Sequence, residues 1–133
     1  MGIKIQIVDS KDTDHRALLD FFKGNKYQVF LSNTVKKALR NIKKEKPGLV
    51  FLAFDLPDLN GVEVLKKIKK NGESIVVFAI VSSVEKGIEA MKLGAEHYFL
   101  KPYNLEEAKI VLERCLALKH YKDRIEESSL SRY

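Results

Sequence analysis

Side chains that could bind a cation or form ion pairs follow four apolar runs of this sequence. They are carboxylates, hydroxyls and one ammonium group: Asp9, Ser10, Asp55, Ser82, Ser83 and Lys101. Mg²⁺ prefers several carboxylate and water oxygens in octahedral geometry. Asp9 and Asp55 could therefore bind Mg²⁺ only weakly and only in cooperation, and we expect no resident metal ion or other cofactor. Lys101 could instead form an ion pair with either carboxylate.

Five apolar runs alternate with five segments of helical spacing. The apolar runs cover residues 3–8, 27–31, 49–53, 75–81 and 97–100. Apolar residues in the helical segments recur at i, i+3 and i+4, and the last segment starts after Asn104, with Glu107 in capping-box position. Strands that are apolar almost throughout and alternate with helices predict an α/β fold, a three-layer, doubly wound, five-stranded parallel sheet.

The predicted sheet would bring the polar residues together. In an open parallel sheet the functional crevice lies at the carboxyl ends of the strands. Asp9 and Ser10 follow the first run, Ala53 ends the third run, Ser82 follows the fourth and Lys101 follows the fifth. We therefore expect one site at this edge of the sheet.

Size and composition indicate a single globular domain. The chain has 133 residues, a formal net charge of +6 and one cysteine, Cys115. One cysteine allows no disulfide within the chain, which suits a reducing compartment, and we expect a cytoplasmic protein. No apolar run approaches the roughly 20 residues that span a bilayer, so we expect no membrane partner. The positive charge permits an anionic partner without requiring one.

Four short motifs, in this order on five βα units, resemble the receiver domain of two-component response regulators over about residues 3–118. They are Ile7-Val8-Asp9, the turn from Leu56 to Gly61, Val81-Ser82-Ser83, and Gly94-Ala95 followed by Tyr98 and Lys101-Pro102. The resemblance implies a flavodoxin-like (βα)5 fold with strand order 2-1-3-4-5. It also implies a signalling module of a phosphorelay and not an enzyme.

The position of the family's phosphoacceptor aspartate is occupied by Ala53. The family places that aspartate eight residues before the glycine of the turn and four before its proline, and counting back from Gly61 and from Pro57 gives Ala53 both times. An alanine methyl group cannot form an acyl phosphate. The resemblance therefore indicates an atypical receiver, or pseudo-receiver.

Two further features of the sequence also differ from the family pattern. The family usually ends its first strand with two acidic residues that hold Mg²⁺, whereas this chain has Asp9-Ser10. The interval from Ser82 to Lys101 is about three residues shorter than is usual in the family, so we expect a trimmed loop or helix after the fourth strand. The remaining matches are switch-equivalent residues: Ser82, Tyr98 and Lys101.

The resemblance predicts a phosphorylation-independent module that acts by binding another signalling protein or an effector domain. A homodimer through the fourth helix, fifth strand and fifth helix is a further possibility. One alternative is a working receiver that uses Asp55 as a displaced acceptor. Another is nucleic-acid binding through basic residues of the second and third helices: Lys36, Lys37, Arg40, Lys43, Lys44, Lys46, Lys66, Lys67, Lys69 and Lys70. Direct nucleic-acid binding is disfavoured because no DNA-reading helix accompanies them.

The last helix is longer than the domain requires. Its apolar spacing continues from residue 105 to about residue 127, which predicts a receiver-like domain over residues 1–119 and an extension of the helix with a tail over residues 120–133. The extension could dimerise or connect to a further domain.

Overall fold

The computed structural model describes residues 3–10, 16–25, 27–56, 59–71, 74–115 and 117–118. The chain divides into two compact units, Met1–Pro102 and Tyr103–Tyr133. In the second unit, residues 105–115 are helical. The predicted extension over residues 120–133 lies outside the described residues, and the predicted division at residue 119 stays a prediction.

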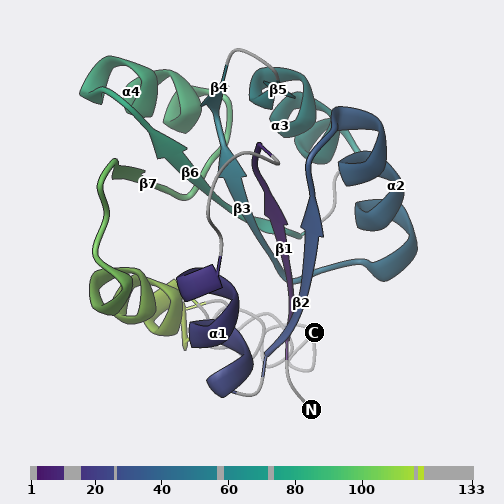
Figure 1. Cartoon of the computed structure of the whole chain (residues 1–133). Coiled ribbons are helices and arrows are strands. Elements are labelled where there is room, and N and C mark those ends of the chain that lie inside the picture. Colours follow the sequence, from purple (N-terminus) through teal and green to yellow (C-terminus); the bar gives the residue numbers. More distant parts are fainter. Residues whose placement is uncertain are drawn as a thin grey trace, which may run out of the picture. The chain divides into compact units, whose positions relative to one another are not determined.

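The first unit is built on a parallel sheet of five strands (Figure 1). In chain order these are β1 (Lys4–Val8), β2 (Gln28–Ser32), β3 (Leu49–Ala53), β6 (Val76–Val81) and β7 (His97–Leu100). Their spatial order is β2-β1-β3-β6-β7 and every neighbouring pair is parallel. This is the predicted order 2-1-3-4-5, and it confirms the flavodoxin-like fold.

Four helices of the first unit begin close to the carboxyl ends of strands. They are α1 (Arg16–Gly24), α2 (Val35–Glu45), α3 (Gly61–Lys70) and α4 (Val84–Lys92). Three of the helices have a side chain that caps the first turn: Thr34 accepts from Lys37 N, Asn60 from Glu63 N and Ser83 from Lys86 N. Each cap satisfies a backbone N–H that has no partner within its helix.

The two faces of the sheet carry different cores. Phe22 of α1 packs on Phe51 with ring centroids 5.3 Å apart, and Phe51 contacts Phe78 and Phe99 in turn. The opposite face has a second buried cluster, in which alternate residues of the strands, such as Val50 and Leu52, join side chains of α2, α3 and α4. In Figure 1, α1 lies on one side of the sheet and α2, α3 and α4 on the other.

The structure adds one element that the sequence did not predict. After β3 the chain forms a small antiparallel pair, β4 (Asp55–Leu56) and β5 (Leu59–Asn60), where we expected a turn. In this pair Asp55 lies opposite Asn60 and Leu56 opposite Leu59. Among the described residues, no helix is long and apolar enough to cross a membrane.

Candidate functional site

The strand ends bring the predicted site residues to one edge of the sheet. The register pairs Val8 with Leu52 and Val81 with Leu100, and it pairs Ala53 with Ile80. Four adjacent strands, β1, β3, β6 and β7, therefore end at nearly the same level. The residues that end or follow them, Asp9, Ala53, Ser82 and Lys101, share the carboxyl edge as expected.

The alternation of side chains along β3 also assigns Ala53 to one face of the sheet. Phe51, Phe78 and Phe99 lie on the face covered by α1. Because successive strand residues point to opposite faces, the same alternation assigns Ala53 to the α1 face. Tyr98 has the opposite parity and packs against the cluster on the side of α2, α3 and α4. Tyr98 therefore lies on the other face of the sheet from Ala53.

Asp9 and Ser10 are both buried, at 7% and 6% exposure. The carboxylate oxygen Oδ1 of Asp9 accepts a hydrogen bond of 2.7 Å from the backbone N–H of Ser10. The N–H of Asp9 donates to the carbonyl of Ser32 on β2 at 3.1 Å. These bonds fix the position of Asp9 directly after β1. Within the described residues, no group of three or more His, Cys, Asp or Glu side chains could hold a metal ion.

Ala53 is buried at the end of β3, under the first turn of α3. It is 1% exposed, and the next residue, Phe54, donates its N–H to the carbonyl of Ile80 at 3.1 Å. Gly61 lies against this segment: a Cβ at position 61 would be 2.6 Å from the carbonyl oxygen of Phe54 and 2.9 Å from that of Ala53. The glycine of the turn is thus needed because α3 begins in contact with the backbone of Ala53 and Phe54.

Asp55 leaves the five-stranded sheet. It belongs to β4 and pairs with Asn60 in the small antiparallel pair, while Ala53 is the last residue of β3. The sequence argument for a displaced acceptor assumes that the extended geometry of β3 continues to residue 55. The two residues instead lie in different sheets. The side chain of Asp55 lies outside the described part of the structure.

The connection between β6 and α4 consists of two residues only, Ser82 and Ser83. Ser82 is exposed, and Ser83 accepts from Lys86 N at 3.2 Å as the cap of α4. That this loop or α4 itself is shorter than is usual in the family stays a prediction. A capping role for Ser83 could have been predicted from a serine that directly precedes a helical segment.

Tyr98 is half-buried, and its ring lies against Gly87 of α4. A Cβ at position 87 would overlap ring atoms of Tyr98, so the close approach requires glycine. Gly87 was not among the predicted site residues. The structure buries Gly87 and Ala90 of α4 and exposes the larger Ile88 and Met91. The small residues on the inner side of α4 make room for the tyrosine ring.

Lys101 is exposed at the end of β7. Its backbone N–H donates to the carbonyl of Val81 at 2.9 Å. The ion pairs found between described residues do not include one between Lys101 and Asp9. The expected pairing with Asp9 is therefore not seen, and the pairing with Asp55 falls on a side chain outside the described residues.

Comparisons with known proteins agree with this arrangement. The family described as response regulator receiver domain matches residues 5–113 of the chain. Sporulation initiation phosphotransferase F of Bacillus subtilis (strain 168) is 33% identical over 121 residues, which are 90% of this chain and 98% of that protein. The transcriptional regulatory protein ZraR of Escherichia coli (strain K12) is also 33% identical, over 92% of this chain. This chain spans only 28% of the length of ZraR.

A solved structure shows the same fold. The receiver domain of NtrX from Brucella abortus matches with a TM-score of 0.74 and 27% sequence identity. The match covers 85% of this chain and 98% of that domain.

Proposed function

The chain belongs to the response regulator receiver family, and we propose that it transmits signals without being phosphorylated itself. The observation that carries this proposal is Ala53, a buried methyl group at the end of β3 where the family resemblance expects an aspartate. Phosphoryl transfer to a receiver needs a nucleophilic oxygen positioned in line with the leaving group. Ala53 supplies no such oxygen.

The surroundings of Ala53 support the same proposal. Asp9 is followed by Ser10, whose side chain is a hydroxyl and not a second carboxylate. The Oδ1 atom of Asp9 already accepts the N–H of Ser10 at 2.7 Å. Mg²⁺ that neutralises a transferring phosphoryl group needs several oxygen ligands, and a single carboxylate provides few of them. Metal-assisted phosphorylation would thus lack both its nucleophile and most of its metal site.

The interaction surface that we propose is the exposed side of α4 together with the end of β7. Val84, Ile88 and Met91 recur at i, i+4 and i+7, so they form one stripe along α4. They are 49%, 47% and 42% exposed, and Leu100 of β7 is 42% exposed. We call these four residues the α4 stripe. Adjacent exposed apolar side chains of this kind often mark protein–protein contacts.

The partner that we propose is another signalling protein, an effector domain or a second copy of the chain. The core of a protein interface is depleted in charge and rich in apolar residues, which the α4 stripe provides. Its rim would include the exposed ion pair Lys86–Glu89, in which Nζ and Oε2 are 3.4 Å apart. Because Tyr98 packs beneath α4 at Gly87, the surface is supported from inside by a residue that matches the family's switch aromatic.

Phosphorylation independence is tested with a phosphoryl analogue. Beryllofluoride and Mg²⁺ are added to the ¹⁵N-labelled chain while the amide signals of Ala53, Ser82 and Lys101 are followed by NMR. We expect no saturable shift, because no carboxylate stands at position 53 to bind beryllium. Saturable shifts that disappear in an Asp55→Asn variant would show that Asp55 is a displaced acceptor.

The interaction surface is tested by sedimentation velocity of the chain alone and by pull-down of partners, with Ile88→Glu as the variant. We expect Ile88→Glu to abolish self-association or partner capture. Lys92→Glu, on the same helix but outside the α4 stripe, is the control and should retain binding. Equal behaviour of the two variants would contradict the proposed surface.

A further inference from the structure

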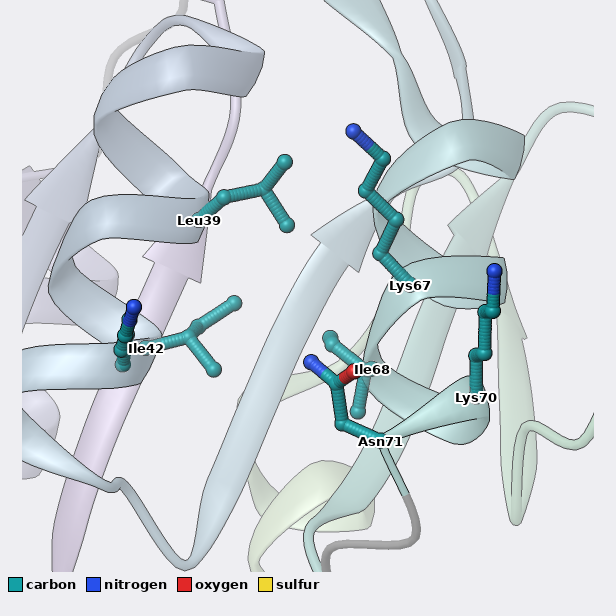
Figure 2. A pocket seen from close by; sticks show the side chains of 7 residues that line it. Leu39, Ile42, Lys67, Ile68, Lys70 and Asn71 are labelled. Atoms are coloured by element: carbon teal, nitrogen blue, oxygen red, sulfur yellow. The ribbon is translucent and has the colours of Figure 1, made fainter.

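A groove with a cavity volume of about 670 Å³ lies between α2 and α3. Its lining combines apolar, cationic and amide side chains: Leu39, Ile42, Lys43, Lys67, Ile68, Lys70 and Asn71. Figure 2 shows Leu39 and Ile42 pointing from α2 toward the wall formed by α3. The volume falls within the range of roughly 300–1,000 Å³ that is usual for small-molecule pockets.

The floor of the groove is apolar and short. Ile42 and Ile68 are buried, and Leu39 is half-buried above them. On each helix the lining residues cover one turn, from Leu39 to Lys43 and from Lys67 to Asn71. At about 1.5 Å per residue this gives a length of about 6 Å, the spacing between side chains at i and i+4 of a helix. The floor therefore fits two apolar side chains from one turn of a partner helix.

The rim of the groove is cationic. The α2 segment VKKALRNIKKE has five basic residues and one acidic residue, and the α3 segment GVEVLKKIKK has four and one. Both acidic residues already have cationic neighbours, since Glu45 pairs with Lys4 at 3.3 Å and Glu63 pairs with Lys67 at 3.4 Å. A partner of negative charge would meet little repulsion here.

The lysines of α2 and α3 differ in the ion pairs that they form. Lys69, outside the groove, pairs with Glu96 at 2.8 Å and donates to the carbonyl of Ile75. Among the described residues, neither Lys43 nor Lys70 forms an ion pair. The pair of Lys67 with Glu63 is exposed on both sides, and exposed ion pairs of this kind are weak, so Lys67 can exchange partners.

We propose that this groove binds an acidic amphipathic helix of a partner protein. Two apolar side chains at i and i+4 of that helix fill the floor between Leu39, Ile42 and Ile68. Its carboxylates face Lys43, Lys67 and Lys70, and the amide of Asn71 offers a further hydrogen-bond donor. The groove is formed by other helices than the α4 stripe, so this proposal stands or falls separately from the proposed function.

Nucleic acid and a second copy of the chain fit the groove less well. A phosphate backbone would use the lysines and leave the apolar floor unfilled, and the lining contains no aromatic side chain on which a base could stack. A second copy carries the same formal charge of +6, which opposes association through this rim.

The test uses a designed probe, a fluorescein-labelled helical peptide of about 14 residues with leucine at i, i+3, i+4 and i+7 and glutamate elsewhere. A control peptide has the same composition but distributes its leucines around the helix. Single-stranded (dT)20 is the nucleic-acid probe. Binding to the full chain is followed by fluorescence anisotropy and by ¹⁵N NMR shifts. We expect the amphipathic peptide to bind at least tenfold more tightly than the control and to shift the groove amides.

The matched variants are Lys43→Gln/Lys70→Gln, which removes two rim charges, and Lys44→Gln/Lys66→Gln, which removes two charges from the same helices outside the groove. We expect the first to weaken peptide binding about fivefold or more at low salt and the second by less than twofold. The proposal would be overturned if the two double variants lost peptide affinity equally, or if the chain bound both peptides with equal affinity. It would also be overturned if neither peptide bound, or if only (dT)20 shifted the amides of the groove.

Discussion

The ring of Tyr98 lies directly against the α-carbon of Gly87, on the inner side of α4. No side chain larger than hydrogen fits at position 87 without displacing the ring. The aromatic residue that resembles the family's mobile switch is therefore packed beneath the helix whose outer side carries the α4 stripe. The contact links strand β7 to α4, and it predicts strong energetic coupling between the two positions.

A Gly87→Ala substitution should destabilise the chain by about 1–2 kcal/mol, because overpacking against Tyr98 exceeds the gain of about 1 kcal/mol that alanine brings inside a helix. In a Tyr98→Ala background the same substitution should become stabilising. Urea unfolding of the four proteins measures this cycle. Gly24→Ala is the control, since nothing lies within 4 Å of its added Cβ. Additive effects at positions 87 and 98 would contradict the packing.

Glu96, the residue before β7, connects this strand to β6 and α3 by hydrogen bonds. One carboxylate oxygen accepts the N–H of Val77 at 2.6 Å and the other accepts Lys69 Nζ at 2.8 Å. Glu96→Ala should cost about 1–3 kcal/mol of unfolding free energy, since it leaves the N–H of a buried strand residue without its acceptor. Glu89→Ala, which removes the exposed pair with Lys86, should cost less than about 0.5 kcal/mol. Equal losses in thermal unfolding would refute the role assigned to Glu96.

Ser32 connects two side-chain amides, of which Gln6 is buried and Asn41 half-buried. Its hydroxyl oxygen accepts from Gln6 Nε2 and, at 2.9 Å, from Asn41 Nδ2. Gln6 is fully buried, and its Oε1 atom accepts no hydrogen bond from any described residue. Ser32→Ala should therefore destabilise the chain by about 1–3 kcal/mol, because the amide donors lose their acceptor.

Replacing the amide as well should recover part of that loss. In Gln6→Met/Ser32→Ala the buried polar group is replaced by an apolar side chain of similar length, so we expect higher stability than in Ser32→Ala alone. Denaturant unfolding of the single and double variants checks this. A double variant that is less stable than Ser32→Ala would show that Gln6 has another role.

Restoring the acidic residues should restore a metal site. Ala53→Asp alone should destabilise the chain, because it buries a carboxylate at the strand edge that already carries Asp9. In Ser10→Asp/Ala53→Asp, millimolar Mg²⁺ should raise the melting temperature by several degrees, since ligand binding to the folded state stabilises it. The unmodified chain should show no such rise, and a Mg²⁺-dependent rise in it would contradict the account of this edge.

The fold was predictable from the sequence because its strands are nearly continuous apolar runs between helices that have clear starts and stops. The strand bounds differ by one residue at most: β2 covers Gln28–Ser32 where residues 27–31 were predicted. The β4–β5 pair escaped prediction because two-residue strands leave no periodicity to detect. Of the predicted extension, the positions beyond residue 118 lie outside the described residues.

The sequence predicted the positions of site residues that follow from strand order. It did not predict contacts that depend on how a helix packs on the sheet. Asp9, Ala53, Ser82 and Lys101 share one edge because parallel neighbouring strands end there. The contact of Gly87 with Tyr98 depends on how a helix sits on the sheet, which no local pattern in the sequence reports. The exposure of Ile88 and Met91 could not be predicted either, because helical spacing identifies an apolar stripe without saying which side of α4 is buried.

The most direct test of phosphorylation independence is intact-mass spectrometry after incubation with acetyl phosphate and Mg²⁺. Ser10→Asp/Ala53→Asp, which regains both acidic positions, is the positive control, and Asp55→Asn removes the only displaced acceptor that we considered. The account predicts no mass gain in the unmodified chain and a gain of one phosphoryl group in the positive control. A phosphoryl gain in the unmodified chain that is lost in Asp55→Asn would contradict it and identify a working receiver with a relocated acceptor.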